Sequence, residues 1–456
     1  MRQILFTGIT LLLCSNMEAQ DVPKQWTLEE CIRYATDNNV SLKQQERNEE
    51  SKKIELEASK NSWIPNLNAY AGQNLDFGRT PSREGVIVDR NSANSSFQVQ
   101  LAMPLFDGFK IPNNIAVRKL NLMAATASLD KAKEDLALNV TSYYLMVLYS
   151  KEILHIAELQ VDMTKEQVIR TEALENAGAV PMSQVFDIRA QLAREEVTLT
   201  EAGNNVGLAL LDLMQALELE RLGAEFDIVQ PEIKDAIADN ITSVLPPDNI
   251  FDNAVTFKPQ IKEQEYLLES QRKMLKVVQA DYYPRLSFSA NYSNGYYRYF
   301  GGDDIVPVPF GDQLKQNERK TIGLSINIPV FNRFEIRNNV RQVRVAIITR
   351  ELAMENNKKA LYKDIQQAYF MAVAAQEKYV ASEKSVIASK EALTSAQERY
   401  AAGNSTVFEY NESKAKYAQS LSEQAQAKYN FIFHAKILDF YNGTPVSLYE
   451  NKQYRD

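Results

Sequence analysis

The hydrophobic positions of this chain switch twice between a helical period and a period of two, and the switches predict its elements. Residues 27–62 predict two helices rich in Glu, Lys, Gln and Ala, which end before Pro65. Apolar and polar residues then alternate within four segments, which predict strands at about 66–77, 96–105, 285–296 and 321–331. The fold class that follows is mainly α with a small β part.

A helix of unusual length is predicted after each second strand. Neither Pro nor Gly occurs between Pro112 and Gly178, which allows about 100 Å of continuous helix. Apolar residues recur there every seven positions, as they do again in 340–400, and this period predicts coiled-coil packing of long helices. Because a partner helix returns after each Gly turn, helical hairpins are predicted at 112–219 and 335–441.

These elements form a unit that occurs twice. The segment 103–109 recurs as 328–334, and Gly178 recurs as Gly403, in both cases 225 residues later. Upstream of the loop between the paired strands the offset is 219 residues. A difference of six fits a length change in that loop, where insertions are tolerated best. A repeat of this length indicates a duplicated half rather than a solenoid unit.

The beginning of the chain has the pattern of a secretory signal peptide. Arg2 precedes an apolar run at 4–13 that is too short to span a bilayer as a helix. Leu13 stands before Cys14, where lipid attachment needs a small residue, so we expect cleavage without acylation, which leaves Cys31 as a buried thiol. The predicted organisation is a signal peptide at 1–20, a first repeat at 21–219, a linker at 220–249, a second repeat at 250–441 and a polar tail at 442–456.

Composition and motifs argue against an enzyme. The 456 residues carry a net charge of −8, whereas nucleic-acid binding needs clusters of Lys and Arg. His155 and His434 lie in helical stretches without Cys, His or Asp at metal-ligand spacing. The chain also lacks a Gly-rich phosphate loop, a Gly-x-Ser-x-Gly elbow and a Cys-x-x-Cys pair. We therefore expect no catalytic residues, no cofactor, no metal and no nucleic-acid partner.

The four strands have a length and pattern that suit a tilted crossing of a bilayer. The alternative is a half-buried sheet in a soluble sandwich. Two strand pairs about 200 residues apart make a poor sandwich, and aromatic residues at 296–300 crowd the loop end as an interfacial belt would. Because four strands leave unpaired edges that a membrane does not tolerate, this interpretation requires several copies of the chain.

One acidic pair stands out on the returning helix of the second hairpin. Glu409 and Glu412 lie three residues apart on one helix face, and at the offset of 225 they correspond to Gln184 and Asp187. In a single chain this is a solvated surface. If several hairpin tips surrounded an axis, the same carboxylates would form a ring that attracts cations.

The ordered set of repeats, Pro-bounded strands, long hairpins and Gly turns resembles the TolC-like outer membrane efflux proteins over nearly the whole chain after the signal peptide. The resemblance implies a homotrimer whose chains each give four strands to a twelve-stranded β-barrel in outer membrane lipid. It also implies an α-helical tunnel (α-barrel) across the periplasm, a periplasmic adaptor (membrane fusion protein) and an inner-membrane pump. The implied function is a passive exit duct of a tripartite efflux or type I secretion system.

Residue by residue, the resemblance assigns roles at the hairpin ends. Glu409 and Glu412 match the tunnel-entrance carboxylates, and Tyr400 matches a gate tyrosine. The family's gate arginine falls on Ser405 and its acidic partner on Gln184, so the ionic latch of the family cannot form between these positions. The adaptor-contacting tips fall on Gly178, Ala179, Val180, Gly403, Asn404, Ser405 and Thr406.

A second hypothesis shares the hairpins and the signal peptide. It is a periplasmic coiled-coil scaffold or adaptor without a channel. Such a protein has no use for strands of membrane length with apolar residues on one face, and this pattern is what favours the channel.

Overall fold

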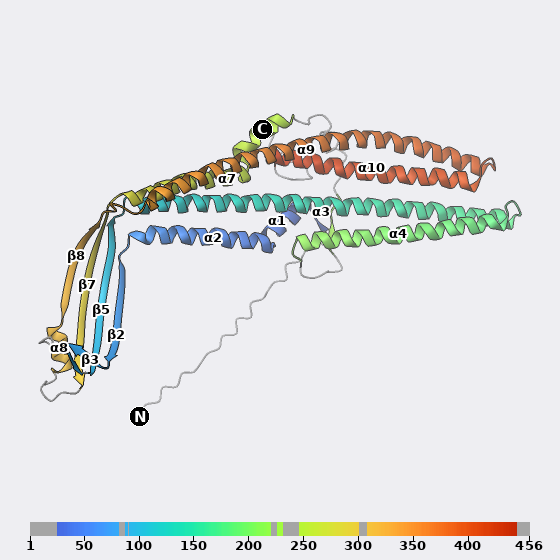
Figure 1. Cartoon of the computed structure of the whole chain (residues 1–456). Helices are drawn as coiled ribbons and strands as arrows, with labels where there is room; N and C mark the ends of the chain where they lie inside the picture. The colour runs from blue at the N-terminus through green and yellow to red at the C-terminus, as the bar shows by residue number, and fades with distance from the viewer. Residues whose placement is uncertain are drawn as a thin grey trace, which may run out of the picture.

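The computed structural model describes residues 25–81, 87–89, 91–219, 226–230, 246–300 and 308–444. The chain forms a long bent body, with a sheet at one end and the turns of two helical hairpins at the other (Figure 1). The prediction of a mainly helical protein with a small β part is confirmed. The predicted signal peptide and most of the polar tail lie outside the described residues.

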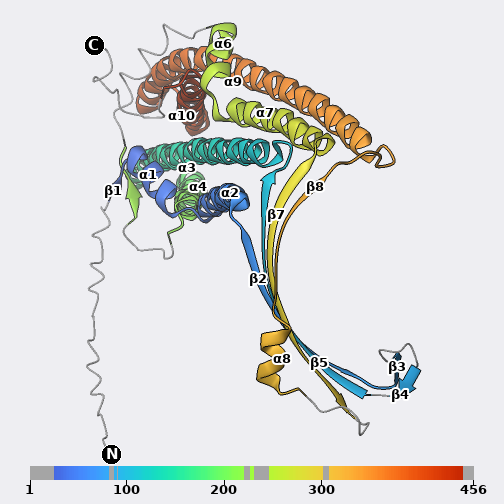
Figure 2. The ribbon, with the colours of Figure 1, turned by 90° about the vertical axis from the view of Figure 1, so that its left-hand side faces the viewer.

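The sheet contains four antiparallel strands in the order β2 (Asn66–Asp76), β5 (Asn91–Phe106), β7 (Arg285–Phe300) and β8 (Arg319–Asn327). Its register aligns apolar residues in rows across the strands, and one row consists of Leu67, Leu101, Ala290 and Ile322. Ile322 is 77% exposed in the single chain, so this apolar face has no cover. Figure 2 shows how the strands curve as they leave the helices.

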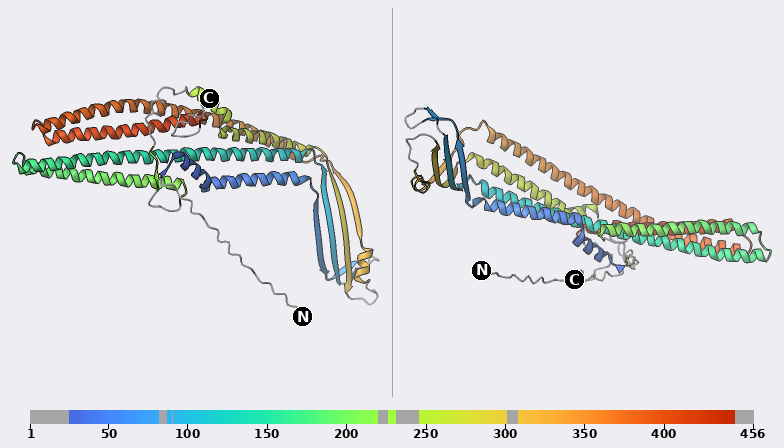
Figure 3. Two further views of the ribbon diagram at one scale, coloured as in Figure 1. Left: turned by 180° about the vertical axis from the view of Figure 1, so that it is seen from behind. Right: turned by 90° about the horizontal axis from the view of Figure 1, so that it is seen from below.

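Two hairpins make up most of the helical body. Hairpin 1 consists of α3 (Lys110–Asn176) and α4 (Met182–Ala216), and hairpin 2 consists of α9 (Glu335–Ala401) and α10 (Val407–Tyr441). The helices lie side by side in the order α9, α10, α3, α4, so α9 and α4 form the two outer edges (Figures 1 and 3). Within the described residues, none of the helices is apolar enough over a sufficient length to cross a membrane.

Shorter helices complete each repeat. The helix α2 (Val40–Lys60) packs along the sheet-proximal part of α3, and α7 (Pro259–Gln279) lies between the sheet-proximal parts of α3 and α9 and contacts both. The helices α1 (Leu28–Asn38) and α6 (Pro247–Phe257) lie near the middle of the molecule. A capping box at Thr27 begins α1, whereas α6 begins with a proline at its first position.

The duplication is visible in element lengths. The helices α3 and α9 have 67 residues each, and α4 and α10 have 35 each. The bounds of the helices before the strand-to-strand loops differ by 219 residues and those of the helices after them by 225, as the sequence predicts, whereas the strands differ in length between the repeats. Two residues related by these offsets are called mates below.

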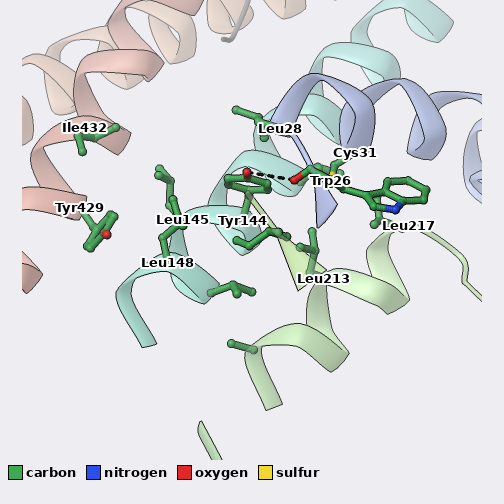
Figure 4. Close-up of a cluster of buried hydrophobic side chains, with 14 of the residues drawn as sticks. Trp26, Leu28, Cys31, Tyr144, Leu145, Leu148, Leu213, Leu217, Tyr429 and Ile432 are labelled. Atoms are coloured by element: carbon green, nitrogen blue, oxygen red, sulfur yellow. Dashed lines mark hydrogen bonds between the residues drawn. The ribbon is translucent and has the colours of Figure 1, made fainter. Parts of the chain in front are cut away.

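A hydrophobic core at mid-length joins the repeats. The strand β1 (Gln25–Trp26) pairs in parallel with β6 (Asp227–Ile228), which lies in the predicted linker. The Tyr144 hydroxyl of α3 lies 2.6 Å from the Val229 carbonyl oxygen and 3.2 Å from that of Trp26. Side chains from α1, α3, α4 and α10 surround it (Figure 4). Cys31 is fully buried in this core.

The segments between paired strands contain more structure than the loops that the sequence predicts. Between β2 and β5, β3 (Arg79–Pro81) pairs with β4 (Ile87–Asp89), and α8 (Phe310–Gln316) precedes β8. The predicted strand at 321–331 is too long, because β8 ends at Asn327, which pairs with Arg285, the first residue of its neighbour β7. Single-turn 3-10 helices, at Asn61–Trp63 and Ala280–Tyr282, connect α2 and α7 to the sheet.

Candidate functional site

Both hairpins turn through one backbone motif. Gly178 and Gly403 have φ angles of 73° and 74°, in the left-handed region that glycine adopts without steric cost. In each turn, two N–H groups donate to carbonyls in the last turn of the preceding helix, which is the Schellman motif. The bonds run from Gly178 to Glu175 and Ala179 to Leu174 (both 2.8 Å), and from Gly403 to Tyr400 (3.1 Å) and Asn404 to Arg399 (2.9 Å).

The predicted adaptor-contacting residues lie together at these turns. Most of them are exposed, and Val180 and Ser405 are half-buried. A Cβ atom at Gly178 or Gly403 would meet no atom within 4 Å, so the tips have open space around them. The two turns differ in the residue before the next helix, which is Pro181 in hairpin 1 and Thr406 in hairpin 2.

The two predicted ring carboxylates are both exposed but have different surroundings. Glu409 accepts a hydrogen bond from the Ser405 hydroxyl at 2.5 Å, and its own N–H donates to the Thr406 hydroxyl at 3.3 Å. Glu412 forms an ion pair with Lys416 at 2.7 Å, one turn further along α10. Lys416 therefore offsets the charge of Glu412, whereas the charge of Glu409 has only a neutral partner.

The predicted gate residues do not contact one another as a latch. The N–H of Gln184 donates to the Pro181 carbonyl at 3.0 Å, and the Ser405 hydroxyl donates to Glu409, so each bonds within its own hairpin. Tyr400 stacks on Tyr410 with ring centroids 5.7 Å apart and planes 21° apart. Within the described residues the buried Tyr400 hydroxyl has no hydrogen-bond partner. Tyr400, at the position of the family's gate tyrosine, therefore packs against an aromatic ring of its own hairpin.

A buried polar network that the sequence analysis missed joins the two hairpins. Lys414 of α10 is 2% exposed, and its ammonium group forms an ion pair with Glu195 of α4 at 2.7 Å. The same ammonium donates to the Thr164 hydroxyl and, at 3.3 Å, to the Gln160 carbonyl of α3. Burial lowers the pKa of Lys414, and the carboxylate of Glu195 opposes this shift. One lysine of hairpin 2 is therefore bound by both helices of hairpin 1.

The sequence did contain a signal for this network. Buried residues of α4 recur every seven positions at Ile188, Glu195, Ala202 and Ala209, so Glu195 occupies a coiled-coil core position. Lys414 lies on the buried stripe of α10 between Tyr410 and Ala418. A charge on an apolar stripe indicates a buried pair, although it does not identify the partner.

The positions mated to this network do not form a second buried ion pair. The mates of Thr164 and Glu195 are Ser389 and Ser420, whose hydroxyls are 2.6 Å apart. The mate of Lys414 is Arg189, which pairs within hairpin 1 with Glu172 at 2.6 Å and is 54% exposed.

The two histidines do not form a metal site. His155 is exposed and lies 3.7 Å from Glu158, whereas burial lowers the pKa of His434. Across the part of the chain that the structure describes, no cluster of three or more His, Cys, Asp or Glu could hold a metal ion.

Comparison with known proteins gives consistent matches. The sequence pattern of the family described as "Outer membrane efflux protein" matches residues 31–218 and 251–436, one stretch in each repeat. The outer membrane efflux protein BepC of Brucella suis biovar 1 (strain 1330) is 20% identical over 358 residues, which cover 78% of this chain and 72% of BepC.

Two solved structures show the same fold. CusC, studied for transmembrane channel formation, superposes with a TM-score of 0.77 at 15% identity and covers 92% of both chains. The CmeC outer membrane channel of Campylobacter jejuni gives a TM-score of 0.73 at 18% identity, covering 92% of this chain and 86% of CmeC.

Proposed function

Because this chain belongs to the outer membrane efflux protein family, we propose that three copies assemble into a passive exit duct through the outer membrane and the periplasm. A periplasmic adaptor engages the hairpin tips, and an inner-membrane pump supplies energy and selects the substrate. The chain itself has no catalytic role in this proposal.

The observation that carries the proposal is the pair of open edges in both layers of the molecule. In the described chain, β2 and β8 each pair with only one strand, and α4 and α9 lie at the outer edges of the helical layer. Joining copies edge to edge satisfies the backbone groups of both outer strands. The same operation covers the outer helices, so one rotation closes a twelve-stranded barrel and a helical tunnel together.

The sheet supports insertion into a bilayer. Ile322, Leu324 and Ile326 of β8 are 77%, 67% and 63% exposed in the single chain. Apolar side chains of this size are costly to leave in water, at about 1.5–3 kcal/mol each. Lipid contact on the outer surface of a closed barrel removes that cost.

The hairpin tips form the periplasmic entrance in this proposal. Glu409 contributes most to a ring of negative charge, because Lys416 neutralises part of the field of Glu412. Asp187 of hairpin 1 is exposed and adds charge at the mated position of Glu412. A negative ring at a constriction favours cations over anions.

Single-channel recording in planar bilayers tests this function. We expect stable conductance with cation preference, a large loss of that preference in Glu409→Gln and a smaller loss in Glu412→Gln. Glu335→Gln, at the opposite end of α9, serves as the control and leaves selectivity unchanged. Unchanged selectivity in both tip variants would remove the ring assignment, and an absence of conductance would contradict the channel itself. Recovery of the protein only in the soluble periplasmic fraction would favour a coiled-coil scaffold instead.

A further inference from the structure

We propose that Glu196 on α4 of one copy and Lys378 on α9 of the next form an ion pair across the interface between copies. This inference rests on the assembly proposed above and identifies the residues that hold it together. Because the chain is internally duplicated, the contact within one chain serves as a template for the contact between copies.

The template is the contact between the hairpins, called the inner joint. A hydrophobic cluster joins α3 to α10 there, with Ile156, Ala418 and Ala425 buried at its centre. Ile153 of α3 and Leu421 of α10 are half-buried and pack against the same cluster. The inner joint thus places the first helix of hairpin 1 against the second helix of hairpin 2.

The mates of these residues define the outer faces of the chain. The second helix of hairpin 1 is α4 and the first helix of hairpin 2 is α9, and these lie at opposite edges of the helical layer (Figures 1 and 3). The mates of the five residues named above are all exposed in the single chain. They are Ala381 and Lys378 on α9, and Ala193, Glu196 and Thr200 on α4.

Further towards the middle of the molecule, the outer faces expose apolar side chains. Leu145 of α3 lies beside Phe433 of α10, and both line one small cavity of the inner joint. Their mates are Phe370 and Leu208, which are 66% and 59% exposed. Large apolar side chains on the outer faces are therefore exposed to solvent, whereas their mates contact a neighbouring helix.

A second copy of the chain is the partner that fits these faces. The exposed face of α4 corresponds to the face of α10 at the inner joint, and the exposed face of α9 corresponds to that of α3. A second copy therefore offers its α9 to the α4 of the first. Contacts of this kind are heterologous, with α4 of one chain against α9 of the next, and they close into a ring when the rotation is correct. Three chains with two hairpins each place six hairpins around one axis.

The chemistry of the two interfaces differs at one mated pair. Leu421 and Ile153 belong to the apolar cluster of the inner joint, whereas their mates are Glu196 and Lys378, which have opposite charges. Both side chains are exposed in the single chain. An ion pair at this position fixes the register of neighbouring copies and disfavours a shifted or inverted contact.

Charge exchange in the full-length protein tests the pair. Glu196→Lys and Lys378→Glu each place like charges at the interface, so we expect each to lower the temperature at which the purified trimer dissociates. The double variant Glu196→Lys/Lys378→Glu restores the pair in reversed order, so its dissociation temperature should return most of the way to that of the unmodified protein. Lys384→Glu is the control, because its mate Leu159 is 44% exposed and lies outside the cluster.

Cross-linking tests the contact independently of stability. In the double variant Glu196→Cys/Lys378→Cys, a short bis-maleimide should produce covalent dimers and trimers, whereas each single variant should produce none. Cys31 does not interfere, because it is fully buried. A trimer without cross-links and without charge rescue would overturn the interface but leave the exit duct standing. A chain that remains monomeric would overturn both.

Discussion

The inner joint and the outer faces occupy mated positions of the duplicated chain, yet their charges are distributed differently. Among the residues that the structure describes, three ion pairs connect the repeats, from the sheet end to the tips: Lys110–Asp281, Lys258–Glu134 and Lys414–Glu195. Their mates are Glu335 with Ser62, Lys359 with Asn39, and Arg189 with Ser420, and none of these is a pair of opposite charges. The backbones of the two repeats are therefore alike, but their charged residues are not. The ion pairs connect the two repeats of one chain, and the mated positions have no equivalent pairs.

This difference indicates where the tube can open. At the inner joint, separation of the hairpins would leave Lys414 and Glu195 buried and unpaired or expose them together with the cluster around Ile156. The outer faces carry instead the exposed residues Glu196 and Lys378. We therefore expect the two hairpins of one chain to move as a unit and the contacts between copies to change when the entrance opens.

The largest effect should come from breaking the buried pair. Lys414→Met leaves the Glu195 carboxylate buried without a counter-ion, which costs about 3–5 kcal/mol. The matched control is Arg189→Met at the mated position, where the pair with Glu172 is exposed and worth about 0.2–1 kcal/mol. Thermal unfolding of the purified protein compares the two variants, and hydrogen exchange locates the loss. Equal losses of stability at the two positions would show that the buried ion pair does not stabilise the inner joint more than an exposed pair does.

Removing both charges of the pair should restore much of this stability. In Lys414→Met/Glu195→Leu, apolar side chains fill the space without leaving an uncompensated charge, and such exchanges are often neutral or stabilising. Thr164 then loses two of its polar partners, so a residual loss of about 1 kcal/mol is expected. The same thermal measurements decide the point, and a double variant less stable than Lys414→Met would contradict this description of the pair.

The turns should respond equally, in contrast to the joints. Gly403→Ala and Gly178→Ala each force an alanine into a left-handed backbone conformation, at a cost of about 1–2 kcal/mol. Space is open around both glycines, so no additional clash separates the two variants. Unequal losses at the two turns, measured by thermal unfolding, would show that the tips are not equivalent.

The smallest effect concerns the mid-length core, where Cys31 and its mate Ile250 are both buried. Burial raises the pKa of Cys31 from 9.0 to about 12. Between these values the unfolded chain loses the thiol proton while the folded chain keeps it, so stability is complete below pH 9 and falls as the pH rises. The expected loss between pH 9 and pH 10 is about 1 kcal/mol.

Alkylation at pH 9 gives the parallel chemical measurement. Native Cys31 should react far more slowly than the same residue in urea, because both access and thiolate formation are suppressed. Cys31→Val removes the thiol and should flatten the alkaline slope in thermal unfolding. Rapid labelling of the native protein would contradict the burial of this residue.

The parts of the fold that repeat a local pattern could be predicted from the sequence. Heptads specify long helices, Gly178 and Gly403 specify turns, and alternation specifies strands, since each depends on neighbours within a few residues. The β3–β4 pair and α8 were missed, because their segments contain many turn residues and no clear period. The pairing of β1 with β6 was also missed, since two-residue strands carry no periodic signal.

The candidate site was predicted less completely, and for a different reason. The sequence places the acidic pair and the turns on one end of the hairpins, but the ion pair of Glu412 with Lys416 depends on side-chain geometry. The Lys414–Glu195 contact joins residues on different hairpins, and local patterns cannot select such a partner. The duplication makes the remaining step possible, because a contact seen once within the chain predicts its mate between chains.

Imaging of single particles of the detergent-extracted protein tests the central claim most directly. We expect hollow particles of three chains, in which six hairpins surround one axis and α4 of each copy lies against α9 of the next. Particles with a single chain, a different number of chains or no central channel would contradict the account.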